Sequence, residues 1–366
     1  MSVLGDRLSR APSQPREWAQ ARSAGIEAAL PEGNSEKLSG NRTIVTIWSI
    51  HYLRAIAALG VVIFHSLDDT GWSFTFGAGG IHLFFAISGF LMLSIAQGRP
   101  RTAGAFLKDR IVRIVPLYWI ATLVAVFSTF WFPGYFWQAT RAPLIVAKSL
   151  LFIPQIGPEG GVYPVLYQGW TLQYEMFFYA IFSFCLLLPR AARIPIISGI
   201  LISLAVAGIA LEPTDPLLKT YTDPMCLDFL AGVWAAGLVR IRLSPRTALG
   251  LSVFGWLTFV AAYTFEEDLS FWSDLIIPLA TGSIVLGMVM LERAGRMVQW
   301  PWLRFTGESS YSIYLFQTVG FALVATFLPA MSALLQVVTY TGAALTVGIL
   351  TFLFIERPTL KLIKGR

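Results

Sequence analysis

Apolar runs long enough to cross a bilayer recur along this chain, and they constrain its fold more than any other feature. The hydrocarbon core of a membrane is about 30 Å thick, which a helix crosses with about 20 apolar residues. Hydrophobic residues make up 55% of the chain and charged residues 13%, against about 25% charged residues in an average soluble domain. We therefore expect an all-α, polytopic integral membrane protein. About ten spanning helices are predicted, at residues 47–67, 81–97, 114–132, 170–189, 194–211, 225–239, 247–264, 271–291, 309–328 and 332–355.

The distribution of basic residues predicts how these helices are oriented. Cytoplasmic loops of membrane proteins carry an excess of Lys and Arg. If the N-terminus is cytoplasmic, nearly all of the 27 basic residues fall in segments on the cytoplasmic side, and the acidic stretch 266–268 falls outside. A wrong number of spans would destroy the alternation between basic loops on the cytoplasmic side and loops with few basic residues on the outer side. Both termini are therefore expected in the cytoplasm.

Polar segments flank a single membrane domain. Residues 1–46 have no sustained apolar period and predict a flexible cytoplasmic tail; more than forty polar residues precede the first apolar run, unlike a cleavable signal peptide. Residues 47–358 form the predicted membrane domain and 359–366 a short basic cytoplasmic tail. A run at 144–153, ending at Pro154, is too short to cross and predicts a re-entrant or interfacial segment.

Several classes of function are disfavoured. The net charge of +6 comes without a basic patch interleaved with aromatic residues, so we expect no nucleic-acid partner. Cys185 and Cys226 lie in apolar runs and form neither a disulfide framework nor a metal site. There is no phosphate loop, no G-x-S-x-G and no H-E-x-x-H, so any catalysis must use polar residues within the membrane. No internal repeat or matched pair of broken helices points to an inverted-repeat transporter.

The first predicted helix carries three ionisable residues. Arg54 and His65 are eleven residues apart, which places them on one helix face about 16 Å apart, with His51 on nearly the same stripe. Charged groups in hydrocarbon are costly, so this face is predicted to line a cavity. The alternatives are that Arg54 is a snorkelling anchor and that His65 is an interfacial residue bonded to water or to Asp68.

Arg110 and Arg113 share one face at the start of the third predicted helix. Paired guanidiniums at the cytoplasmic surface suit the phosphates of a nucleotide-bearing cofactor, because each can form bidentate bonds. The competing interpretation is that they set topology and contact lipid headgroups.

Two carboxylates lie within predicted spans. Glu175 is about a turn and a half inside its helix, with Tyr179 on the same face. It must be neutral, hydrogen-bonded, or paired with a cation such as Arg54, so an interhelical bond competes with a catalytic role. Asp228 allows the same two interpretations, and the structural one is favoured.

The second predicted helix begins with His82 at its outer end and contains the pair Ser88 and Gly89. Small residues of this kind permit close helix contact. His82 is expected on the same side of the membrane as His65, where the two imidazoles could approach each other.

Taken together, these residues resemble acyltransferase family 3, membrane acyltransferases that modify sugars of bacterial envelopes and exopolysaccharides. The resemblance covers roughly residues 47–358, and GWTLQYEMFFY is similar to the branch that includes exopolysaccharide-production acyltransferases. The matching segments are Arg54 with His65 (the Arg-x10-His pattern), GAGGIHLFFAISGF at 77–90, RIVRIVP at 110–116, GWTLQYEMFFY at 169–179, GESSYSIYLFQ at 307–317 and FIERP at 354–358.

Two positions depart from the family pattern. His82 stands where the family often has an acidic residue, so a carboxylate partner for His65 must come from elsewhere, with Asp68 and Asp69 as candidates. Gln317 stands where the family often has histidine, so no proton-transfer role is assigned to it.

The resemblance implies an acyl-CoA-dependent O-acyltransferase of the bacterial cytoplasmic membrane. The donor would be cytoplasmic acyl-CoA, with acetyl-CoA as first choice, held at its phosphates by Arg110 and Arg113. The acceptor would be a hydroxyl of an exopolysaccharide, another envelope glycan or a lipid-linked oligosaccharide at the outer face. No metal is implied. Further partners would be the polysaccharide-synthesis machinery or another copy of the chain.

The resemblance also assigns roles to the polar residues. His65 would act as general base on the acceptor hydroxyl, Arg54 would orient the donor or stabilise negative charge, and Glu175 would position His65 or a substrate hydroxyl. An acyl-histidine relay is an alternative mechanism. Substrate contact or support would come from His82, Tyr179, Trp170 and Asp68.

Two other classes of protein compete with the enzyme. A transporter or flippase for a polar lipid or sugar would use Arg54, Glu175 and the histidines to line a path, and acyl-CoA-independent uptake would favour it. A structural subunit of a polysaccharide-export assembly explains the spans but gives no reason for a charged stripe.

Overall fold

The computed structural model describes residues 47–365, apart from 68, 69, 71, 73, 99–101, 133–135, 137–141, 158 and 159, and apart from the side chains of 266–271. The predicted N-terminal tail, 1–46, lies outside these residues. Throughout the described part the chain is helical without a strand; one isolated β-bridge joins Ile156 and Val162. The predicted all-α class is therefore confirmed.

Helices occupy all ten predicted positions. Their bounds, with short connecting helices included, are α2 Trp48–Ser66, α3 Thr75–Ala78, α4 Gly80–Gly98, α5 Ala103–Ser128, α6 Pro143–Leu150, a 3-10 turn Tyr167–Gly169, α7 Trp170–Cys185, α8 Arg190–Leu211, α9 Pro216–Tyr221, α10 Cys226–Leu238, α11 Pro245–Thr264, α12 Glu266–Arg293, α13 Pro301–Phe327, α14 Ala333–Thr351, a π-turn Phe352–Glu356 and α15 Arg357–Lys364.

Eight helices of the described part are long and apolar enough to cross a membrane, so the protein is a multi-pass membrane protein. At two further predicted spans the helices are shorter, with 16 residues in α7 and 13 in α10. The count of ten and the orientation of the termini therefore stay predictions. The short run ending at Pro154 forms α6, whose 8 residues extend only about 12 Å.

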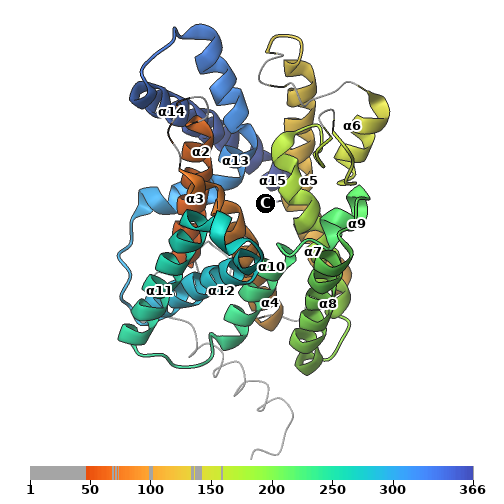
Figure 1. Ribbon diagram of the computed structural model, residues 1–366, viewed down its shortest axis with the longest axis vertical. Coiled ribbons are helices and arrows are strands. Elements are labelled where there is room, and N and C mark those ends of the chain that lie inside the picture. Colours follow the sequence, from red (N-terminus) through yellow and green to blue (C-terminus); the bar gives the residue numbers. More distant parts are fainter. Residues whose placement is uncertain are drawn as a thin grey trace, which may run out of the picture.

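The helices form two groups around a central region (Figure 1). In that view α5 to α9 lie on the right, and α2 to α4 lie on the left with α10 to α14. α10 packs along α4 and also contacts α12 and α8. Large apolar side chains on the outside remain exposed, as expected where helices face lipid; examples are Phe127 at 58%, Val206 at 58%, Leu257 at 67% and Val338 at 59%.

Two glycines let α4 and α10 pack at backbone distance. A Cβ atom at Gly89 would lie 2.0 Å from the carbonyl oxygen of Phe229, and one at Gly232 would lie 1.9 Å from that of Ala86. The close contact predicted from Gly89 is therefore confirmed. The ring of Phe229 stacks on Phe85 at 4.4 Å between centroids, which fills the space beside the crossing.

A π-turn joins α14 to α15. Pro358 lies in the first turn of α15, where it offers no N–H and its ring would clash with the carbonyl four residues earlier in a regular helix. The wider turn at Phe352–Glu356 avoids this clash. It also turns the Glu356 side chain inward, where it is 3% exposed and accepts a 2.5 Å hydrogen bond from the Ser312 hydroxyl.

A carboxylate from α12 caps the start of α2. Ile47, the N-cap residue, offers no side-chain acceptor. Glu292 supplies it instead: its two oxygens accept bonds from the backbone nitrogens of Trp48 at 2.7 Å and Ser49 at 2.9 Å, and from the Ser49 hydroxyl at 2.5 Å. A negative charge at a helix N-terminus also interacts favourably with the helix dipole.

We expect Glu292→Ala to lower the stability of the protein by about 1–2 kcal/mol, because two backbone donors lose their capping acceptor. The measurement is the thermal unfolding midpoint of purified protein in detergent. The control, Glu308→Ala, removes a partly exposed carboxylate that pairs with Arg304 at 2.8 Å and should cost less than about 0.5 kcal/mol. Equal midpoints for Glu292→Ala and the wild type would contradict the capping role.

Candidate active site

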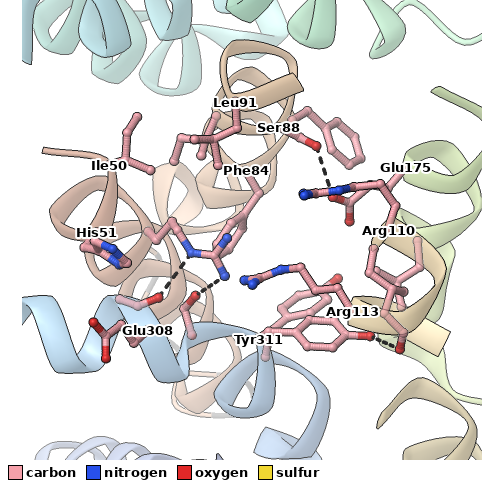
Figure 2. Close-up of a pocket in the computed structure, with 18 of the residues that line it drawn as sticks. Ile50, His51, Phe84, Ser88, Leu91, Arg110, Arg113, Glu175, Glu308 and Tyr311 are labelled. Atoms are coloured by element: carbon pink, nitrogen blue, oxygen red, sulfur yellow. Dashed lines mark hydrogen bonds between the residues drawn. The ribbon is translucent and has the colours of Figure 1, made fainter. Parts of the chain in front are cut away.

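A cavity of about 570 Å³ lies between the two groups of helices. One wall comes from α2, α4 and α13, the other from α5 and α7, and the π-turn and α15 add the last residues (Figure 2). The polar residues of its lining are His51, Arg54, Ser88, Arg110, Arg113, Thr171, Glu175, Tyr179, Glu308, Ser310, Tyr311, Tyr314 and Glu356.

The cavity follows α4 along the bundle. Its lining includes one face of that helix from Ile81 to Ile95, and the helix rises about 21 Å between these two residues. This length is about two thirds of the hydrocarbon thickness. Except for Ser88, the face is apolar, since its members are Ile81, Phe84, Phe85, Ile87, Ser88, Leu91, Met92 and Ile95.

Arg54 is fixed inside this cavity. Its Nε donates to the Gly307 carbonyl at 3.1 Å, one terminal nitrogen donates to the Ser310 hydroxyl at 2.9 Å, and the guanidinium lies 5.9 Å from the centroid of the Phe84 ring. Gly307 permits this approach, because a Cβ there would lie 2.0 Å from the His51 carbonyl oxygen. The bonds to α13 favour the cavity interpretation over the snorkelling anchor.

Arg110 and Arg113 also line the cavity, from the first three turns of α5. In Figure 2 they lie across the cavity from His51. The Arg110 guanidinium lies 5.8 Å from the centroid of the Phe106 ring, and its Nε is buried without a hydrogen-bond partner among the described residues. An unsatisfied buried donor is costly, and an anionic ligand in the cavity would satisfy it.

Glu175 is hydrogen-bonded within the cavity wall. Its Oε1 accepts a bond from the Ser88 hydroxyl at 3.1 Å and another from the Tyr179 hydroxyl. The Ser88 hydroxyl also lies 3.4 Å from that of Tyr179. The carboxylate is therefore held by a small hydrogen-bond network between α4 and α7, which orients it toward the cavity without an ion pair to any described residue.

His65 lies apart from this group. It is half-buried near the C-terminal end of α2, with its ring 5.0 Å from that of Phe64, and it is not among the residues that line the cavity. α3 and the start of α4 pack on this half of α2, where Gly60 meets Gly77. The histidine that shares the cavity with Arg54 is His51, which lies one helical turn before Arg54. Its buried Nδ1 has no hydrogen-bond partner in the described part of the chain.

His82 faces away from the cavity and bonds to Asp228 with 2.5 Å between Nδ1 and Oδ2. It does not lie level with His65: Gly80, two residues before it, packs against Ala57 and Val61, so the two histidines differ by at least about 9 Å along the helix axes.

Of the remaining predicted site residues that the structure describes, one lines the cavity and one does not. Tyr179 lines the cavity, whereas Trp170 begins α7 and contacts Tyr174 with 5.8 Å between ring centroids. Asp68 and Asp69 lie outside the described residues. Gln317, to which no role was assigned, is fully buried.

Several cavity residues were not singled out from the sequence. Ser310 binds Arg54, and the Tyr311 hydroxyl donates to the Ile114 carbonyl at 2.9 Å. Glu308 and Glu356 add two carboxylates to the lining. The signal was present, because these residues fall inside GESSYSIYLFQ and FIERP, two of the segments that resemble the family.

The chain belongs to acyltransferase family 3, whose acyltransferase domain matches residues 47–353. Fold and family together define a multi-pass membrane acyltransferase. It is similar to exopolysaccharide production protein ExoZ of Rhizobium meliloti (strain 1021), with 37% identity over 316 residues that cover 83% of this chain and 96% of that protein. No solved structure matches the chain.

Proposed function

We propose that this enzyme transfers an acyl group, acetyl in the first place, from cytoplasmic acyl-CoA to a hydroxyl of an exopolysaccharide or other envelope glycan at the outer face of the bacterial cytoplasmic membrane. The observation that carries the proposal is the cavity that follows α4 and holds Arg54, Arg110 and Arg113. The glycan is suggested by the name of the exopolysaccharide relative.

The donor end of the cavity lies at the predicted cytoplasmic ends of the helices. Ile47 is the N-cap of α2 and His51 lies in its first turn, Glu308 is the eighth residue of α13, and Leu360 belongs to α15. Arg110 and Arg113 bind the coenzyme phosphates, because guanidinium groups match phosphate oxygens in pairs. The thioester arm then extends along the apolar face of α4, where few polar groups compete for it.

With the donor held from the cytoplasmic side and the acceptor from the outer side, acyl transfer is a single displacement at the acyl carbon. The oxygen of the acceptor hydroxyl forms a bond to the acyl carbon, the bond from that carbon to sulfur breaks, and the hydroxyl proton passes through a base to the thiolate. In the proposal the base is His65, as the family pattern implies. Arg54, which lies about 16 Å from His65 along α2, orients the donor in the cavity, and Glu175 orients a substrate hydroxyl.

The function is tested with membrane vesicles that contain the protein, radiolabelled acetyl-CoA and lipid-linked glycan extracted from a producing strain. Label should appear in the glycan, and the ester should be removed by mild base. Vesicles that take up the glycan at the same rate without acetyl-CoA, and leave it unlabelled, would support the transporter instead.

We expect Arg113→Ala to raise the KM for acetyl-CoA about tenfold and to leave kcat nearly unchanged, because binding to phosphates stabilises the ground state and the transition state equally. The control is Arg242→Ala, which removes a basic residue between α10 and α11, outside the cavity lining. An unchanged KM for acetyl-CoA in Arg113→Ala would show that this arginine does not bind the donor and would favour its role in setting membrane topology.

A further inference from the structure

His82 and Asp228 form an ion-pair site that the proposed mechanism does not use. Each is the third residue of its helix, α4 and α10 respectively. Asp228 is fully buried and His82 is 15% exposed. Burying such a pair is costly in desolvation and seldom gives net stability, and ionisable pairs within membrane segments are by default candidates for function.

The geometry orients the imidazole. Asp228 Oδ2 accepts the bond from His82 Nδ1, and its Oδ1 lies 3.3 Å from the Thr281 hydroxyl of α12, which donates to it. Because Nδ1–H donates to the carboxylate, Nε2 is the ring nitrogen left for a ligand, as acceptor in the neutral imidazole and as donor in the imidazolium. Asp228 is the one described hydrogen-bond partner of the ring, through Nδ1, and the side chain is 15% exposed, so Nε2 can meet a ligand.

The pair lies beside the cavity but on another side of α4. Ile81 and Phe85 line the cavity, whereas His82 faces α10 and α11, with 6.2 Å between its ring and that of Tyr263. In the predicted topology α4 and α10 both begin at the outer face. His82 is therefore toward the acceptor side, next to Ile81, the first residue of α4 in the cavity lining.

The surroundings of the pair suit a hydroxyl-rich ligand. Tyr174 contacts Phe85 with 5.9 Å between ring centroids, and its hydroxyl donates to Asp223 at 3.2 Å. Asp223 precedes α10 and interacts electrostatically with His82. Aromatic rings beside a few convergent polar groups are typical of small-molecule sites, and a sugar presents hydroxyls to the polar groups and C–H faces to the rings.

We propose that His82, held by Asp228, binds a hydroxyl of the acceptor sugar through Nε2 and so positions the glycan for acyl transfer. The inference rests on the proposed function and adds the place of the acceptor. In this role the imidazole contacts the substrate, whereas Asp228 acts through the imidazole as a positioning residue.

Two substitutions distinguish glycan binding by His82 from a purely structural hydrogen bond between His82 and Asp228. The amide of His82→Asn reaches the place of Nδ1, so it keeps a bond to Asp228 and lacks Nε2. The amide of His82→Gln reaches the place of Nε2 and gives up the bond to Asp228. Both variants are assayed in vesicles with radiolabelled acetyl-CoA and increasing amounts of the lipid-linked glycan extract.

The expected result is that His82→Asn unfolds at the wild-type temperature, raises the KM for the glycan about tenfold and leaves the KM for acetyl-CoA within twofold. His82→Gln should recover part of the glycan affinity although it is less stable. A wild-type glycan KM in His82→Asn would overturn the inference and leave the proposed function intact. No transfer by the wild-type protein would overturn both.

Discussion

Replacing His65 with alanine is expected to lower the rate of acyl transfer by about 10²–10⁴-fold, because a positioned general base contributes about that much. The protein should still accumulate in the membrane, since the imidazole is only half-buried. The measurement is transfer of label from acetyl-CoA to glycan at saturating concentrations of both substrates, scaled to the amount of folded protein.

The matched control is His51→Ala, because His51 is the histidine that lines the cavity with Arg54. Near the predicted cytoplasmic end it should affect the KM for acetyl-CoA more than kcat. The opposite pattern, in which His51→Ala abolishes transfer and His65→Ala retains it, would move the catalytic role to the cavity histidine.

The second large effect is expected at the crossing of α4 and α10. Gly232→Ala places a methyl group 1.9 Å from the Ala86 carbonyl oxygen, and a backbone atom cannot move aside as a side chain can. The two helices must separate, which breaks the packing of Phe229 on Phe85. We expect a loss of at least about 3 kcal/mol, at the upper end of the cost of overpacking a core.

The measurement is the yield of monodisperse protein by size-exclusion chromatography, together with its unfolding midpoint. Gly250→Ala in α11 is the control, because a Cβ atom there meets nothing within 4 Å and alanine is the better helix former. A wild-type midpoint in Gly232→Ala would show that α4 and α10 lie farther apart than described.

Much of the fold could be predicted from the sequence because membrane helices are marked by local composition. A run of apolar residues predicts a helix wherever it lies, and each predicted span coincides with one. The lengths of α7 and α10 could not be predicted in this way. α10 is enclosed by α4, α8 and α12, so its apolar character reflects burial in protein as well as contact with lipid.

The residues of the candidate site were predicted more accurately than their partners. The structure brings Arg54, Arg110, Arg113, Glu175 and Tyr179 to one cavity, while their catalytic and binding roles stay predictions. Each was found because a charge or hydroxyl stands out in an apolar run.

The partners depend on how helices rotate against one another, and hydropathy carries little of that information. Arg54 bonds to Ser310, which is 256 residues away, and His82 bonds to Asp228, which is 146 residues away. The shared face of Arg54 and His65 follows from helix geometry, but only the packing of α3 and α4 determines where along that face the cavity extends.

The π-turn between α14 and α15 makes the length of this segment matter more than its composition. Its outer side is permissive, since Phe354 is 73% exposed. Deleting one residue from Phe352 to Ile355 would remove the residue that the wide turn accommodates, so the segment would close to a regular helix and bring the Pro358 ring against the carbonyl four residues earlier. A single deleted codon there would therefore strain the entry to α15, which carries Leu360 of the cavity lining, more than most substitutions in the same stretch.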